Sequence, residues 1–217
     1  MNKQAKNNVF FGEESVSNVT KSGISEQALQ AAIADGLLEI RNSTKLDAKT
    51  DPGSRAWGAV IRGLRRELLA ENSLWTFSFV KGLNLTHNKE NGLNIVVMSG
   101  DKYTGLLESS PKSKNPKGAA TEVLVGENYD LFADNNVTNV KKIDTMVNYV
   151  LLYFFDYGKK EVRYELSVPV GMTSNGGKAR IAAWTERNIF QPMPFVQTVN
   201  QIKKEFTEEP NFEVIRK

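Results

Sequence analysis

Apolar residues recur at helical spacing in two stretches of the first third of the chain. Residues 25–41 begin with Ser25, a residue type that caps helices, and residues 54–71 carry one continuous apolar face. The spacing predicts a helix over each stretch, and Gly36 predicts a weak point at which the first helix divides. The apolar positions are Leu29, Ile33, Leu37 and Ile40 in the first helix, and Trp57, Val60, Ile61, Leu64 and Leu68 in the second.

The apolar period then changes to two, which is typical of strands. Residues 74–85 are expected to form one strand, the polar run at 88–92 a turn, and residues 93–100 a central strand. Residues 100–121 show no period and are rich in Pro, Gly and Lys, so they predict a long irregular loop, which in a compact domain is usually functional or disordered. The first strand carries three aromatic residues on one side: Trp75, Phe77 and Phe79.

The clearest pattern covers residues 147–170, where two alternating stretches meet at an Asp-Tyr-Gly-Lys turn. An even-numbered turn pairs Asp156 with Glu161, Phe154 with Arg163 and Leu152 with Glu165. One face of this hairpin is then uniformly apolar, and the other mixes apolar residues with charged ones. The apolar face consists of Tyr149, Leu151, Tyr153, Phe155, Val162, Tyr164, Leu166 and Val168.

Residues 128–139 show no pattern that favours one state, and the other remaining segments complete the prediction. Residues 179–190 predict a third strand, 195–209 a helix and 212–217 a terminal strand, while the polar residues 1–23 predict a mobile N-terminal arm. We therefore expect a single α+β domain over residues 24–217. It consists of a mainly antiparallel sheet of about five to six strands with two N-terminal helices and a C-terminal helix.

Composition narrows the classes of function. The chain has 217 residues, no cysteine and a formal net charge of +3. The lack of cysteine excludes disulfides, thiol catalysis and cysteine-based zinc sites. The sequence offers neither a signal peptide nor an apolar run of membrane-spanning length, so we expect a cytoplasmic protein without a membrane partner. The mild positive charge is compatible with DNA or RNA as a partner but does not require it.

Four acids form the candidate catalytic set: Asp101, Asp156, Glu161 and Glu165. Asp156 and Glu161 face each other across the hairpin, so water, a lysine at the tip (Lys159 or Lys160), Arg163 or a bound Mg²⁺ must neutralise them. Asp101 follows the end of an apolar strand, where it is either a functional carboxylate or part of a turn. These acids support one alternative, a Mg²⁺-dependent nuclease of restriction-endonuclease-like fold. The acid-x-Lys spacing of such enzymes is missing, and Arg does not replace Lys as a proton-transferring group.

Basic residues support the leading hypothesis, a nucleic-acid-associated protein that contacts phosphates. Three lysines lie in the long loop, and three arginines lie on the outer face of the second helix: Lys112, Lys114, Lys117, Arg55, Arg62 and Arg66. A mobile-element or phage-related locus is one setting for such a protein. Trp184 is either a base-stacking platform or a core residue, and His87 is expected in a turn. A third alternative is a non-catalytic protein-binding or inhibitor module that uses the apolar sheet surface.

Five segments resemble a family of uncharacterised bacterial proteins. They are SRAWGAVIRGLRREL, VVMSGDKYTG, PKSKNPKGAAT, YELSVPVG and RIAAWTERNIF, and they span roughly residues 54–190. The resemblance implies that SGDKYTG and PKSKNPKG belong to one recurring architecture. It implies no activity, cofactor or fold.

Overall fold

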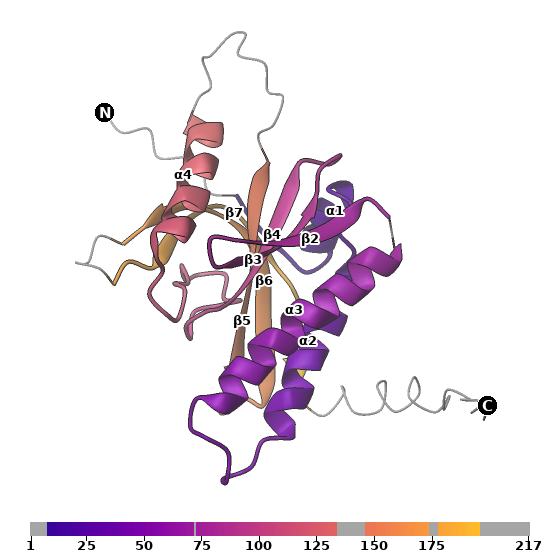
Figure 1. Ribbon diagram of the computed structural model, residues 1–217, viewed down its shortest axis with the longest axis vertical. Coiled ribbons are helices and arrows are strands. Elements are labelled where there is room, and N and C mark those ends of the chain that lie inside the picture. The colour runs from indigo at the N-terminus through magenta and orange to yellow at the C-terminus, as the bar shows by residue number, and fades with distance from the viewer. Residues whose placement is uncertain (1–7, 72, 134–145, 174–177, 196–217) are drawn as a thin grey trace, which may run out of the picture.

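The computed structural model describes residues 8–71, 73–133, 146–173 and 178–195. These residues form four helices and eight strands around one mixed sheet (Figure 1). The predicted α+β class is confirmed. The prediction of a mainly antiparallel sheet of five to six strands was too narrow, because the sheet has eight strands and two of its pairs are parallel.

The sheet runs in the order β1-β7-β6-β5-β4-β3-β2, and β8 pairs with β6 beside this path. The parallel pairs are β1 with β7 and β4 with β5. The second of these arises because helix α4 lies between β4 and β5 in the chain, and a crossover of this kind returns the chain in the same direction. The strands are β1 (Asn8–Phe11), β2 (Trp75–Val80), β3 (Leu83–Asn88), β4 (Leu93–Ser99), β5 (Val147–Asp156), β6 (Glu161–Met172), β7 (Ile181–Ile189) and β8 (Met193–Pro194).

The helices are α1 (Glu13–Lys21), α2 (Glu26–Arg41), α3 (Asp51–Glu71) and α4 (Ala119–Ala133). The two predicted helices are confirmed as α2 and α3. Gly36 does not divide α2, which is one continuous helix. Its lack of a side chain allows α3 to pack closely here, since a Cβ at this position would lie 2.5 Å from Val60 Cγ2. Ser25 caps α2, as expected, by accepting a hydrogen bond from the backbone N–H of Ala28.

Two faces of the sheet carry different layers (Figure 1). Helices α2 and α3 cover one face, where the predicted apolar side of the β5–β6 hairpin is confirmed as part of the main core. Helix α4 covers the other face through Leu124 and Val125, which pack with Val150, Leu152 and Trp184. The long segment between β4 and α4 lies on this second face as well, because its residues hydrogen-bond to Glu165, Trp184 and Arg187.

Residues 8–23 belong to the segment predicted as a mobile arm, and here they form β1 and α1 instead. β1 pairs in parallel with β7, and Ser15 Oγ donates a 2.8 Å hydrogen bond to the carbonyl of Ile189. Asn18 donates to the side chains of Glu186 and Asn188. The polar residues of this segment therefore bind the sheet edge by hydrogen bonds, which an apolar period does not reveal. Residues 1–7 lie outside the described residues.

Residues 74–85 form a hairpin, not the single predicted strand. Lys81 and Gly82 both have positive φ, 50° and 87°, and they connect β2 to β3 as a two-residue turn. Positive φ at both positions is the geometry of the tight turns that favour hairpins. The predicted turn at 88–92 and the predicted strands at 93–100 and 179–190 are present, whereas His87, expected in a turn, lies in strand β3. The predicted helix at 195–209, apart from Phe195, and the predicted strand at 212–217 lie outside the described residues.

Candidate functional site

The two acids at the hairpin tip are held by an arginine. The predicted register is confirmed, with Asp156 opposite Glu161. The buried side chain of Arg163 lies 3.1 Å from Asp156 Oδ2 and 3.8 Å from Glu161 Oε1. Backbone N–H groups of Lys159 and Gly158 also donate to Asp156. The hydrogen bond from Lys159 is the main cause of the lowered pKa of this carboxyl. Arg163 thus supplies a positive charge to both acids.

Glu165 is buried in the interior of the sheet layer. Its side chain is 0% exposed and accepts hydrogen bonds from Arg187, from Ser167 Oγ at 3.0 Å and from the backbone N–H of Gly105 at 3.0 Å. Arg187, 2% exposed, also donates to the carbonyls of Ser109 and Leu106. Glu165 and Arg187 therefore act together as an anchor that fixes the long segment onto β6 and β7.

Asp101 stabilises a turn. Its Oδ1 accepts a 3.0 Å hydrogen bond from the backbone N–H of Tyr103, and its carbonyl accepts one from Thr104. Arg163 links this turn to the hairpin acids, because its guanidinium donates hydrogen bonds both to the carbonyl of Lys102 and to Asp156. Across the described parts of the chain, no three His, Asp or Glu side chains gather as a metal site would require.

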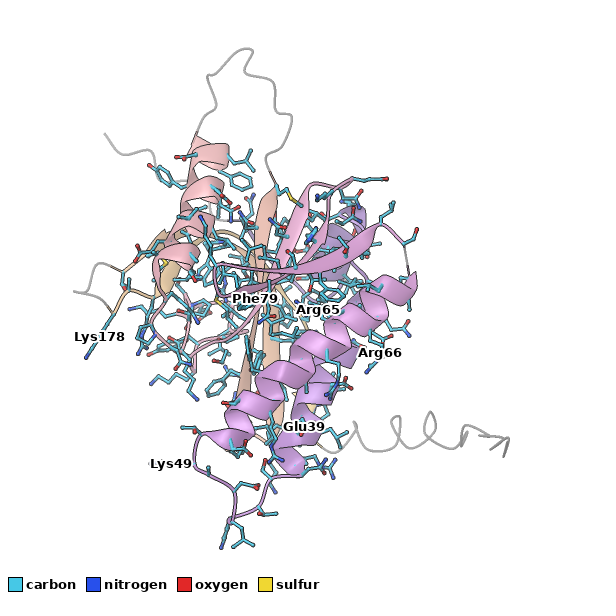
Figure 2. All side chains as sticks on the ribbon, viewed as in Figure 1. Glu39, Lys49, Arg65, Arg66, Phe79 and Lys178 are labelled. Carbon is cyan, nitrogen blue, oxygen red and sulfur yellow. The ribbon has the colours of Figure 1, made fainter. Side chains whose placement is uncertain are left out.

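The three predicted arginines of α3 are each paired with acids. Arg62 lies 3.6 Å from Glu39, and Arg66 lies 2.8 Å from Asp35, both of which belong to α2. Arg66 also pairs with its neighbour Glu67, and Arg55 pairs with Asp47 and Asp51. Figure 2 shows Arg66 and Glu39 on the neighbouring helices α3 and α2. The stripe that is positive in the sequence is therefore largely neutralised in the fold.

The three predicted lysines lie on a segment that is fixed by its backbone. The N–H of Lys114 donates to the carbonyl of Ser99, and the N–H of Lys117 donates to the carbonyl of Ala179. The side chains of Lys112 and Lys114 are exposed, while that of Lys117 is partly buried. Trp184 of β7 also holds the same segment, because its Nε1 donates a hydrogen bond to the carbonyl of Pro111. The Trp184 side chain is buried, at 4% exposure. Trp184 is therefore a core residue, not a stacking surface.

Lys117 lines a groove with a volume of about 620 Å³. The groove lies between the β2–β3 turn, the C-terminal half of β4 and the start of α4, and it also includes Trp57 of α3. Its charged lining residues are Lys81 and Lys117, and no Asp or Glu of the described chain contributes to it. We call it the lysine groove. It lies at the carboxyl end of β4, which is parallel to β5, and this is where α/β proteins commonly bind ligands.

Within the part of the chain that the structure describes, no Asp or Glu lines the lysine groove, although Glu122 lies in the first turn of α4. Burial, followed by the charge of Arg180, lowers the pKa of the Lys117 ammonium group, so the two cations are close enough to repel. Among the described residues, neither has an ion-pair partner, in contrast to the arginines of α3. The first N–H groups of a helix have no partner within it, and those of α4 begin at the same groove. The site therefore favours an anion.

Sequence reasoning missed several of the residues that matter here. Lys81 belongs to the Lys-Gly turn, but the alternating pattern predicted one strand across that turn. Arg180 is far from Lys117 in the sequence, and only the fold brings its charge near.

None of the described helices is long and apolar enough to cross a membrane. A search of protein-family models, of curated proteins and of solved structures finds no match to this chain.

Proposed function

We propose that this protein binds nucleic acid by contacting its phosphates at the lysine groove. The observation that carries the proposal is the groove at the start of α4, whose charged lining residues are Lys81 and Lys117 and to which no Asp or Glu of the described chain contributes. Two cations held close together repel unless an anion lies between them or near them. A phosphate supplies that charge and accepts hydrogen bonds from the lysine and from backbone N–H groups.

The positive surface extends beyond one phosphate. Lys112 and Lys114 are exposed on the same backbone-anchored segment as Lys117, and Lys81 lies across the groove. A row of cations along one segment fits a chain of phosphates better than a single small anion. Arg55, Arg62 and Arg66 have a smaller part in this proposal than in the sequence-based hypothesis, because acids already neutralise them.

The proposal does not include cleavage. Arg163 already neutralises Asp156 and Glu161, and Arg187 neutralises Glu165. Asp101 uses its carboxylate in a turn. Each predicted acid thus has a partner within the protein that accounts for its position.

Fluorescence anisotropy with a labelled 20-mer tests the proposal. The variant Lys112→Gln, Lys114→Gln, Lys117→Gln is expected to weaken binding and to flatten the plot of log affinity against log salt. Removal of one lysine–phosphate pair changes the slope by about 0.7 on a single strand and about 0.9 on a duplex. The control is Lys21→Gln, Lys45→Gln, Lys49→Gln, which removes the same charge from exposed positions elsewhere. If both variants lower affinity equally, only net charge matters and the groove is not the site.

A further inference from the structure

Strand β2 exposes two aromatic rings on one side. Phe77 is 52% exposed and Phe79 is 71% exposed, and as alternate residues they share a face of the strand. Figure 2 labels Phe79 on this strand. β2 is the last strand of the sheet on its side, so no further strand of the described chain pairs with its outer edge. Two exposed phenylalanines two positions apart are unusual enough on a folded surface to indicate an interaction site.

The surroundings of Phe77 are basic. The guanidinium carbon of Arg65 lies 4.5 Å from the centre of the Phe77 ring, and Arg65 also donates to the carbonyl of Leu85 at 3.3 Å. A shallow depression of about 420 Å³ separates Phe77 from α3. Its charged lining residues are Arg62, Arg65 and Arg66. Arg62 and Arg66 are paired with acids, whereas Arg65 has no ion-pair partner among the described residues.

This surface continues into the lysine groove. Phe79 pairs with Asn84 across the β2–β3 hairpin, and Asn84 lines the groove. Trp57 of α3 lines it too: its ring is 39% exposed, and its Nε1 donates a 3.0 Å hydrogen bond to the carbonyl of Val97, which fixes its orientation. Lys81 follows directly after β2. We call Trp57, Phe77 and Phe79 the aromatic surface.

We propose that the aromatic surface stacks the unpaired bases of single-stranded DNA or RNA, while Lys81, Lys117 and Arg65 contact its phosphates. This inference rests on the proposed function and names its substrate class. Aromatic rings bordered by cations bind single strands because bases stack on the rings and phosphates pair with the cations. In a duplex the base faces are already stacked on their neighbours, so the rings have nothing to contact. No acid of the described chain lines either depression, and Lys81, Lys117 and Arg65 have no ion-pair partner among the described residues, so the surface favours a polyanion over a protein strand as the occupant.

Anisotropy with one labelled 20-mer, used as a single strand and as a duplex, tests this inference. The variant Phe77→Leu, Phe79→Leu keeps the surface apolar and removes both rings. We expect it to weaken single-strand binding at least about fivefold, the lower end of what one stacked base contributes, and to leave duplex binding unchanged. Tyr129→Leu is the control, since it removes a ring that is 58% exposed on α4, and it should change neither affinity.

The other outcomes separate this inference from the proposed function. If the lysine variant weakens binding while Phe77→Leu, Phe79→Leu does not, the lysine groove binds phosphates and the aromatic surface is overturned as a base-stacking site. If no nucleic acid binds at low salt, both proposals fail. A third outcome is that the protein forms a dimer, that Phe77→Leu, Phe79→Leu converts it to a monomer, and that the protein binds single strands no better than duplexes. In that case β2 pairs with a second copy of the chain, and the inference is wrong. Thermal unfolding of each variant checks that the fold is retained.

Discussion

Glu165 and Arg187 form the anchor that fixes the long segment onto the sheet, and Glu165→Gln removes its negative charge with almost no change in shape. Both side chains are nearly inaccessible, at 0% and 2% exposure. The substitution leaves the Arg187 cation buried without a counter-ion, although its bonds to the carbonyls of Leu106 and Ser109 remain. We therefore expect a large loss of stability, whereas a purely catalytic carboxylate would lose activity and keep its stability.

The size of the effect follows from the burial of the pair. Breaking a buried ion pair by removing one partner costs about 3–5 kcal/mol. For a domain of this length, each kcal/mol lowers Tm by about 2–4 °C, so we expect a decrease of about 6–20 °C. The exposed pair of Arg62 with Glu39, at 66% and 26% side-chain exposure, gives a matched control. Glu39→Gln should cost no more than about 1 kcal/mol.

Urea unfolding followed by circular dichroism measures both variants. The midpoint should fall for Glu165→Gln with little change in the slope m, which would show that stability has changed and not the unfolded state. Arg187→Met should be as costly, and the double variant should cost less than the sum of the two single variants. A Glu165→Gln protein as stable as Glu39→Gln would refute the reasoning, and the role of Glu165 as an anchor would have to be abandoned.

Two further predictions concern the helix contact and the single histidine. Gly36→Ala should lower the free energy of unfolding by about 1–3 kcal/mol, because its Cβ would lie 2.5 Å from Val60 Cγ2. Gly58→Ala on α3 meets open space and should stabilise by about 0.5–1 kcal/mol, and equal effects of the two would contradict the close contact. Burial, then the charge of Lys89, lowers the pKa of His87 below 6.5. The unfolded chain therefore takes up this proton first as pH falls, so stability should decrease below about pH 6.5 in urea unfolding. His87→Gln should remove that decrease, and an unchanged profile would refute the assignment.

The sequence predicts those parts of the fold that depend on local patterns. The β5–β6 hairpin was predicted to the residue because two apolar stretches flank a turn, and a shift by one position would have turned its apolar face outward. Helix α4 was not predicted, because its buried side includes Asn128. The amide of Asn128 bonds the carbonyls of Asn148 and Pro169, so a polar residue interrupts the apolar spacing.

The candidate site was less predictable, because it depends on which charges meet in space. The sequence does not show which acids pair with Arg62 and Arg66. Only the packing of α2 on α3 brings Glu39 to Arg62 and Asp35 to Arg66. Lys117 was identified from its basic, proline- and glycine-rich loop. Its neighbour Arg180 lies more than sixty positions away in the chain, so no local pattern links the two cations.

The most direct test of nucleic-acid binding is a salt titration of the unaltered protein with a labelled single-stranded 20-mer in EDTA, between about 50 and 200 mM salt. We expect log affinity to fall linearly with log salt, with a slope of about −2 to −3, as three or four phosphate contacts on a single strand would give. Absence of binding at the lowest salt, or binding that salt does not weaken, would contradict phosphate contact at the lysine groove.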